Sequence, residues 1–463
     1  MSWIEEELEE ADFGDERLSR RGKQILGSLS NSPESSIPKA CDGWSETIAA
    51  YRFFKNDKVT AEEILSSHKE QTLLRISQQK VALLIQDTTE LDYTKKQNKL
   101  EGLGVLNKEK RYGMHLHPLV AFSPDKLCLG VVSAQILIRE PGTLGSSRKR
   151  LHRNKAIEDK ESYRWLEGYR EANEVAELVP GTQIVMMADR EGDIYEIFQE
   201  ASSLDNRKAD FLIRSNHNRA LAKNSSDETY LYESTVSKKP LGNLEFELPA
   251  RAGRKARTVK LSVYSSIQTL RAPPRPKGHK LSSQTISIIV AREENPPKGE
   301  EPIEWRLITN LPAKYINQAA KLISWYAARW CIEVFFRTFK TGCRIEELQF
   351  KDYEHLAPCL AMYMIIAWRI LFITHFHRQS PEISCEVIFN EAEWKAAYIV
   401  STNKLPPKTI PSIAEMTKMI ASFGGYLGRK NDPPPGPQAL WIGLERVRYF
   451  AWGQAAILQA HAR

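Results

Sequence analysis

Three carboxylates in this sequence have the type and placement needed to act together in a reaction. Asp87 follows the apolar run 81–85, and Asp189 follows a second, mostly apolar run, 183–187. Such runs are typical of buried strands, and the ligand sites of open α/β sheets gather at the carboxyl ends of strands. A single carboxylate at such a position more often caps a turn than reacts. A third acidic residue, Glu333, lies far along the chain and strengthens the case that the two aspartates belong to a functional site.

Glu333 belongs to a set of four side chains with helical spacing. Tyr326, Arg329, Glu333 and Lys340 are separated by three, four and seven residues, which at about 100° per residue places them within about 60° on one face of one helix. A solvated charged face would give the same pattern. Residues 325–336, however, are mostly large apolar and aromatic. We therefore expect the charges to meet a counterpart, namely the two strand-end carboxylates with a divalent metal between them.

This combination suits metal-dependent cleavage of a phosphodiester. Two Mg²⁺ ions about 4 Å apart stabilise both the attacking and the leaving oxygen of such a reaction. Mg²⁺ prefers oxygen ligands and keeps several waters, so three carboxylates suffice. Arg329 would hold a phosphate through paired hydrogen bonds and Lys340 as a point charge. We predict two Mg²⁺ ions, replaceable by Mn²⁺, on Asp87, Asp189 and Glu333.

The spacing of these four side chains resembles the signature of a known family. Tyr326-x2-Arg329-x3-Glu333-x6-Lys340 is similar to the motif of the insertion-sequence-four family of bacterial DDE transposases, which includes the transposon-five enzyme. Five further blocks resemble the family's two aspartate blocks, its N-terminal DNA-binding module and the end of its β-rich insertion: Asp87-Thr-Thr-x-Leu-x-Tyr93, Asp189-Arg-Glu-Gly-Asp-Ile-Tyr195, Phe13-Gly-Asp-x-Arg17, Tyr51-Arg-Phe-Phe54 and Asn295-Pro-Pro-Lys-Gly299…Trp305. The resemblance runs in order over nearly the whole chain. After about residue 375 it rests on pattern and length.

The resemblance implies an α/β protein with a ribonuclease-H-like catalytic core and a β-rich insertion. It places the metal ligands on Asp87, Asp189 and Glu333, and the phosphate-holding motif on Tyr326, Arg329 and Lys340. It also implies a base-flipping role for Trp305 and a DNA contact for Arg214. In the N-terminal module the basic side chains that we expect at DNA are Arg17, Arg20, Arg21, Arg52 and Lys55.

The function implied is cut-and-paste DNA transposition. Strand cleavage at the transposon ends is followed by hairpin formation, hairpin opening and strand transfer to target DNA. The partners are double-stranded DNA, comprising the inverted repeats at the transposon ends and the target, and a second copy of the chain in a DNA-bound homodimer. Two alternatives are a metal-dependent nuclease or resolvase on the same core, and a sequence-specific DNA-binding derivative without catalysis.

Three regions must position these residues. The length of 463 residues exceeds one compact core, and we expect an N-terminal helical DNA-binding domain at 1–72, a catalytic domain at 73–372 with its insertion at about 220–304, and a mostly helical dimerisation region at 373–463. Helices are predicted near 14–26, 44–54, 60 onward, 163–177, 194–201, 313–340, 355–376 and 440–458. Strands are predicted at 81–85, 112–122, 127–138, 183–187, 211–213, 258–263 and 285–290.

The final predicted helix carries an apolar face that has two interpretations. It consists of Leu440, Leu444, Val447, Phe450 and Ile457. A surplus apolar face on a terminal helix indicates contact with a partner subunit. Packing on the protein's own core would explain the same residues.

Composition bounds the remaining possibilities. Lys+Arg 65 against Asp+Glu 58 gives a net charge of +7, a weak indication of a polyanionic partner. The six cysteines have no zinc spacing, which indicates reduced, mostly buried thiols. The acidic start lacks the order of a signal peptide, and the longest apolar stretch, 360–373, is shorter than the ~18 residues of a membrane span and contains Arg369. We expect a soluble protein of the bacterial cytoplasm, with no membrane partner.

Several other residues are open to a structural explanation. His115 and His117 alternate on a predicted strand and face one side, but a histidine pair without a third ligand is weak support for a metal. Trp305 lies in an alternating strand, where an aromatic side chain often simply packs. Two basic runs, 148–155 and 251–260, are either solvated connectors or contacts to the DNA backbone.

Overall fold

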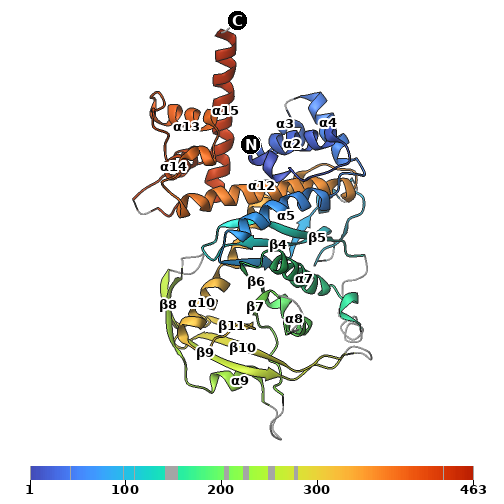
Figure 1. The fold of residues 1–463 in the computed structure, drawn as a ribbon, viewed down its shortest axis with the longest axis vertical. Coiled ribbons are helices and arrows are strands. Elements are labelled where there is room, and N and C mark those ends of the chain that lie inside the picture. Colours follow the sequence, from blue (N-terminus) through green and yellow to red (C-terminus); the bar gives the residue numbers. More distant parts are fainter. Residues whose placement is uncertain are drawn as a thin grey trace.

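The structure is a computed structural model that describes residues 2–41, 43–96, 99–108, 110–140, 155–202, 208–222, 229–248, 256–275, 280–430 and 432–461. Most of the two basic runs, 148–155 and 251–260, therefore lies outside the described residues. The chain forms a helical N-terminal region, a large mixed sheet flanked by helices, and a helical C-terminal region (Figure 1).

The N-terminal region is helical, as the sequence predicts. Side chains cap its longer helices: Asp15 accepts a hydrogen bond from the backbone N–H of Arg17 at 2.8 Å, and Thr60 accepts one from Glu63 at 3.0 Å. The Glu63 carboxylate accepts from the backbone of Asp12 at 3.0 Å instead of closing a capping box. The helices are α1 (Trp3–Glu7), α2 (Glu16–Asn31), α3 (Ile37–Ala40), α4 (Trp44–Phe54) and α5 (Ala61–Ser77).

The middle of the chain forms one continuous sheet. Its strands are β1 (Val81–Gln86), β2 (Thr89–Asp92), β3 (Gly104–Val105), β4 (Tyr112–Phe122), β5 (Cys128–Leu137), β6 (Gln183–Ala188), β7 (Asp210–Arg214), β8 (Gly242–Leu248), β9 (Arg257–Leu270), β10 (Gln284–Glu293) and β11 (Glu304–Thr309). Within the described residues their order is β2-β4-β1-β6-β7-β11-β10-β9-β8, with β3 and β5 also paired to β4. The strands after residue 220 therefore belong to the same sheet as the strands before it.

Pairing directions divide this sheet into two parts. β1, β6 and β7 run parallel, whereas β7 pairs antiparallel with β11, which leads to the antiparallel strands β10, β9 and β8. The strands predicted for the β-rich insertion thus exist, but they extend the main sheet. The connections along the sheet contain α7 (Tyr163–Leu178), α8 (Tyr195–Ala201) and α9 (Leu231–Val236).

Both faces of the parallel strands are buried. On β1, Leu83 and Ile85 join the larger hydrophobic core, while Ala82 and Leu84 join a second core with residues of α7 and α8. This division follows from the period of two along a strand, which sends successive side chains to opposite faces. It explains why the strand has a continuous apolar run and not an alternating pattern.

One long helix, α12 (Tyr353–Gln379), passes through the core between the N-terminal and C-terminal regions (Figure 1). It is longer than the apolar stretch 360–373 suggests, and by length and composition alone it could cross a membrane. However, 83% of its most apolar window is buried inside the protein. The helix therefore lies in the core of the protein.

A buried carboxylate on α1 contacts an arginine and a histidine of α5. Arg75 donates to the Glu7 carboxylate at 2.6 and 3.2 Å, and the ring of His68 contacts the same carboxylate. Burial opposes the charged form of Glu7, but His68 and Arg75 keep the pKa of Glu7 below its ordinary value. Burial lowers the pKa of His68, so its ring is neutral at pH 7.

Removing the Glu7 carboxylate should destabilise the protein strongly. We expect Glu7→Ala to lower the free energy of unfolding by about 3–5 kcal/mol, because Arg75 would stay buried without its counter-charge. Urea unfolding followed by circular dichroism measures this. Glu5→Ala, which removes an exposed carboxylate from the same helix, serves as the control. Equal stability of Glu7→Ala and the wild type would contradict the expectation.

The C-terminal region packs around its own small core. Its helices after α12 are α13 (Glu391–Thr402), α14 (Ile413–Phe423) and α15 (Pro437–His461). Leu440, Leu444 and Val447 are buried in this core, so the first half of the apolar face predicted for partner contact packs within the chain. Phe450 and Ile457 lie on the exposed outer half of α15, which extends away from the other helices (Figure 1).

Candidate functional site

The two strand-end aspartates leave the sheet at the same edge. β1 and β6 are parallel neighbours, with Ile85 opposite Met187. Asp87 and Asp189 each lie two residues beyond this pair. Asp189 then caps a short 3₁₀ turn by accepting a hydrogen bond from the backbone N–H of Glu191 at 2.8 Å. The parallel register therefore brings together two carboxylates that are about a hundred residues apart.

Arg329 connects Glu333 to this edge. One guanidinium nitrogen, Nη1, lies 3.0 Å from Oδ2 of Asp87, and Nη2 lies 2.6 Å from Oε1 of Glu333. The Arg329 side chain is only 17% exposed. A charge-assisted pair in such surroundings is stronger than one on the surface. The counterpart that the sequence suggested for the charged helix thus exists, and Arg329 makes the link directly.

The carboxylates influence one another electrostatically. Burial, followed by the negative charge of Asp189, raises the pKa of Asp87 to about 6, and Glu333 adds to this rise. Arg329 and the backbone N–H of Thr88 oppose it. A cluster of carboxylates that resist joint ionisation is a place where a further cation would be stabilising.

The residues fit a divalent cation by chemistry. All the available donors on Asp87, Asp189 and Glu333 are oxygens, as Mg²⁺ prefers. Within the described part of the chain, no three His, Cys, Asp or Glu residues are close enough to hold one ion together. Arg329 separates Glu333 from Asp87 in this arrangement. Holding a metal with all three carboxylates therefore requires Arg329 to give up at least one ion pair.

The prediction that four motif residues share one helix is wrong. Tyr326 ends α10 (Ile316–Ala327), Arg329 is the N-cap of α11 (Trp330–Arg337), and Lys340 lies in a π-helical turn (Thr338–Gly342). The chain turns at residues 328–329 between the two helices. Tyr326 and Glu333 are therefore placed by different helices.

Lys340 lies beside β2, the strand that follows Asp87 in the chain. Its Nζ donates to the backbone carbonyl of Glu90 at 2.6 Å and lies 3.2 Å from Oε1 of Glu346. The wider π turn changes the direction of Lys340 relative to a regular α-helix. Lys340 is partly exposed, with 27% of its side chain accessible, so its charge lies close to solvent near the end of β1.

An aromatic group borders the carboxylates. Trp305 on β11 is partly buried, stacks on Phe246 of β8 with ring centroids 6.1 Å apart, and meets Tyr326 edge-on at 6.2 Å. The hydroxyl of Tyr326 is buried without a hydrogen-bond partner, and burial raises its pKa to about 12. Arg214, at the end of β7, donates to the backbone carbonyl of Glu304 at 3.3 Å. Trp305 thus packs against two rings and also retains an accessible surface.

Arg214 belongs electrostatically to the same region. Burial lowers its pKa, and nearby Arg190 and Arg329 lower it further, while Tyr326 and Asp189 act in the opposite direction. The structure therefore places Arg214, Tyr326 and Asp189 within electrostatic range of one another. Trp305 joins them through its contact with Tyr326.

A hydrogen-bonded chain behind Asp87 was not identified from the sequence. His117 bonds through Nδ1 to the Thr88 hydroxyl at 2.8 Å and through Nε2 to Oε1 of Gln86 at 2.9 Å. Arg164 donates to the same Thr88 hydroxyl at 2.9 Å. Burial lowers the pKa of His117 to about 3, so the ring is neutral. His117 therefore fixes the residues on both sides of Asp87, and the structural explanation of this histidine is correct.

Removing the ring of His117 should impair the strand-end site indirectly, through the residues that flank Asp87. We expect His117→Ala to reduce the DNA cleavage that the resemblance implies by about 10- to 100-fold, because His117 holds the residues on both sides of Asp87. DNA binding should be unchanged. A gel assay of cleavage, with binding followed separately, measures both quantities. His115→Ala is the matched control, because Nε2 of His115 has no hydrogen-bond partner in the described structure; an equal loss in both variants would contradict this role for His117.

The five basic side chains of the N-terminal region that we expect at DNA lie on the surface and precede the three carboxylates in the sequence. Four of the five are exposed, and Arg21 is partly exposed. Arg17 is 82% exposed and pairs with Asp15 at 3.1 Å. The set comprises Arg17, Arg20 and Arg21 on α2, Arg52 on α4, and Lys55 directly after it.

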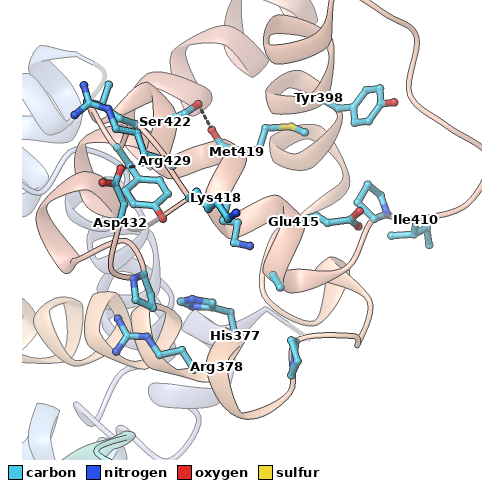
Figure 2. Close-up of a pocket in the computed structure, with 18 of the residues that line it drawn as sticks. His377, Arg378, Tyr398, Ile410, Glu415, Lys418, Met419, Ser422, Arg429 and Asp432 are labelled. Carbon is cyan, nitrogen blue, oxygen red and sulfur yellow. Dashed lines mark hydrogen bonds between the residues drawn. The ribbon is translucent and has the colours of Figure 1, made fainter.

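A separate cavity of about 1130 Å³ lies in the C-terminal region. Figure 2 shows His377 and Arg378 of α12 near Lys418 of α14 at this cavity, which none of the motif carboxylates lines. The cysteines give no further site. All six are free and buried, as the sequence predicts.

Comparison with known proteins identifies the two ends of the chain. Residues 1–59 match the family model described as transposase DNA-binding, and residues 365–459 match the model described as transposase Tn5 dimerisation domain. Among solved structures, the chain is similar to a cryo-EM structure of the piggyBac transposase synaptic complex with hairpin DNA. The identity is 9%, the match covers 95% of this chain and 76% of that chain, and the TM-score is 0.36.

Proposed function

We propose that this chain, a Tn5-like transposase by its two terminal domains, cleaves DNA at transposon ends and joins the freed end to target DNA. The observation that carries the proposal is the link from Asp87 through Arg329 to Glu333, beside Asp189 on the neighbouring parallel strand. Acidic residues, the guanidinium of Arg329 and an aromatic group thus lie near one edge of the sheet, which supports the proposal.

The proposal divides the chain into three working parts. Residues 1–72 bind the transposon end, residues 73–372 form a ribonuclease-H-like catalytic domain with its insertion at about 220–304, and residues 373–463 join two subunits. The exposed basic side chains of α2 and α4 support the first assignment, because phosphate contacts dominate affinity for DNA. The two family matches support the first and third assignments.

In the proposed mechanism Asp87, Asp189 and Glu333 hold Mg²⁺, for which Mn²⁺ can substitute. Two such ions, when bound, stabilise the attacking and leaving oxygens of phosphodiester cleavage. Arg329 exchanges its bonds with the carboxylates for bonds to a phosphate, and Lys340 places a positive charge near the end of β1. Positioning and charge stabilisation carry the reaction, without a covalent enzyme intermediate.

The sequence of steps is cleavage of one strand, attack of the freed 3′-OH on the opposite strand to form a hairpin, opening of the hairpin, and strand transfer. The test is an assay with labelled DNA that carries the inverted repeats flanking the reading frame, together with plasmid target DNA and Mg²⁺. We expect nicked, hairpin and joined products. Cleavage without any joined product would indicate a nuclease and not a transposase. Binding without cleavage would indicate a DNA-binding protein without catalytic activity.

Trp305 should separate two of these steps. A hairpin requires a sharp bend, and extruding one base costs a few kcal/mol, which stacking on an aromatic ring offsets by ~1–3 kcal/mol. We expect Trp305→Ala to slow hairpin formation by about ten-fold or more while nicking is nearly unchanged, so nicked DNA accumulates. Quantifying both products over time measures this.

Two controls distinguish stacking from packing, because Trp305 also contacts Phe246 and Tyr326. Trp305→Phe keeps an aromatic face and should retain most of the hairpin product. A DNA substrate that lacks the extruded base should partly restore Trp305→Ala. Equal loss of nicking and hairpin formation, with a lower melting temperature, would show that Trp305 acts only in packing.

A further inference from the structure

A second cavity, of about 470 Å³, lies where the two ends of the chain meet at the core helix. Its walls come from α1, the end of α2, α12, the segment before α13, and α15. In Figure 1 the helices α2, α3 and α4 lie on the same side of α12 as α15. The lining includes Trp3, Ser30, Arg369, Phe389 and Trp441. A ligand here would contact both terminal regions at once.

Arg369 is an incompletely paired cation in this cavity. Its Nη2 donates to the backbone carbonyl of Ile388 at 3.2 Å, while its Nε is buried without any hydrogen-bond partner. The guanidinium carbon lies 5.2 Å from the centre of a Trp3 ring. Burial lowers the pKa of Arg369 to about 10, but the group is still charged at pH 7. A buried donor on a charged group is costly when it has no acceptor.

The nearby carboxylates are already engaged. Glu7 pairs with Arg75 at 2.6 Å, and Glu393 pairs with Arg448 at 2.8 Å. None of the ion pairs found in the described residues includes Arg369. The two carboxylates that act electrostatically on Arg369 thus each pair with another arginine, which leaves its guanidinium without a carboxylate of its own.

The rim of the cavity limits which anion can enter. Glu6 and Glu386 line the cavity and are exposed, so they repel a ligand with many negative charges, including the DNA backbone. The volume lies toward the lower end of the about 300–1,000 Å³ of small-molecule sites. A small ligand with a single acidic group suits the charge and the size.

We propose that this cavity binds a small anion, a carboxylate or a phosphate group, through the Nε side of Arg369. The acidic group would accept paired hydrogen bonds from Nε and Nη2, the fork by which arginine recognises carboxylates and phosphates. Because helices of both terminal regions form the walls, the anion holds these regions together. The inference does not depend on the proposed catalytic residues.

The first experiment compares thermal unfolding of the full chain in phosphate, acetate and chloride at equal ionic strength. Chloride is the reference because a single atom matches the Arg369 fork less well than the two oxygens of a carboxylate or phosphate. We expect phosphate, acetate or both to raise the melting temperature of the wild type above that in chloride, since a ligand of the folded state stabilises it. A response to only one of the two identifies the ligand as a phosphate or a carboxylate. No difference from chloride would overturn the proposal.

Variants separate this cavity from the DNA-binding surfaces, which also attract phosphate. Arg369→Met should lose the response, and Arg369→Lys, which keeps the charge without the fork, should need about ten-fold more anion. Arg378→Met, an arginine of the same helix that lines the other cavity, should respond like the wild type. Equal responses in the wild type and Arg369→Met would contradict the assignment.

If Arg369→Met does not fold, hydrogen exchange of the wild type still tests whether the anion binds in this cavity. The anion should slow amide exchange in α1 and in residues 385–389, which line the cavity or adjoin it. Protection confined to the first half of α2, α4 and the strand ends would instead place the anion on the DNA-binding surfaces and would reject the cavity.

Discussion

We expect an Asp189→Asn variant to bind transposon-end DNA but to lose cleavage by about a thousand-fold or more, and we expect Asp87→Asn and Glu333→Gln to behave alike. Each substitution keeps the side-chain volume and removes one charge from the cluster at the ends of β1 and β6. Because the pKa of Asp87 is raised to about 6 by burial and by Asp189, the cluster does not need all three charges to fold. Cleavage of labelled DNA in Mg²⁺ and a mobility-shift assay measure the two quantities separately.

The matched control is Asp210→Asn. Asp210 begins β7, the parallel neighbour of β6, so its carboxylate lies at the opposite edge of the sheet, where it accepts a hydrogen bond from Gln183 at 2.7 Å. Cleavage by this variant should stay near the wild-type rate. Near-wild-type cleavage by any of the three site variants would remove that carboxylate from the proposed metal site.

The second large effect concerns the outer half of α15. Tyr449, Phe450, Trp452 and Ile457 are all exposed, by 47%, 38%, 58% and 60%. At about 100° per residue they fall within about 160° of the helix circumference. An exposed apolar face of this kind marks a contact with another molecule. A combined Tyr449→Glu, Trp452→Glu and Ile457→Glu variant should therefore abolish complexes that contain two DNA ends while sparing binding to one end.

Native gels with one labelled end and one longer unlabelled end distinguish the two complexes. Val400→Glu, a charge on an exposed apolar residue of α13, is the control and should still form paired complexes. The substitutions leave Leu440, Leu444 and Val447 in place, because these residues belong to the C-terminal core. Truncation after Pro437 would remove that core contact as well and would confuse unfolding with loss of assembly. Unchanged paired complexes in the triple variant would contradict the role of this face.

The sequence was sufficient to predict most individual elements. Continuous apolar runs marked β1 and β6 because both faces of these strands are buried, and Trp44–Phe54 is a helix with the predicted bounds. The union of the insertion with the main sheet could not be predicted, because the pairing of Leu307 with Arg214 joins segments about ninety residues apart. Local periodicity carries no information about such partners.

The candidate site, too, could be predicted from the sequence only in part. Alignment of Asp87 with Asp189 follows from two strands ending at one edge, which the sequence indicates. The turn at residues 328–329 interrupts a segment without glycine or proline, so nothing local signals it. The bond from His117 to Thr88 was equally hidden, since an alternating histidine pair indicates a shared face and not the acceptor that each ring meets.

The continuous sheet has a mechanical consequence for the DNA. From β2 to β8 each described strand is hydrogen-bonded to its neighbour. Trp305 on β11 and the aspartates beyond β1 and β6 are therefore held by one rigid sheet. Backbone ladders resist bending far more than a duplex of stacked bases, whose kinking by inserted or stacked side chains costs only a few kcal/mol per step. In the proposed function, a transposon end that binds along this sheet would bend more easily than the sheet itself. The fixed distance from Trp305 to the carboxylates would then determine where a strand bends relative to where it is cut.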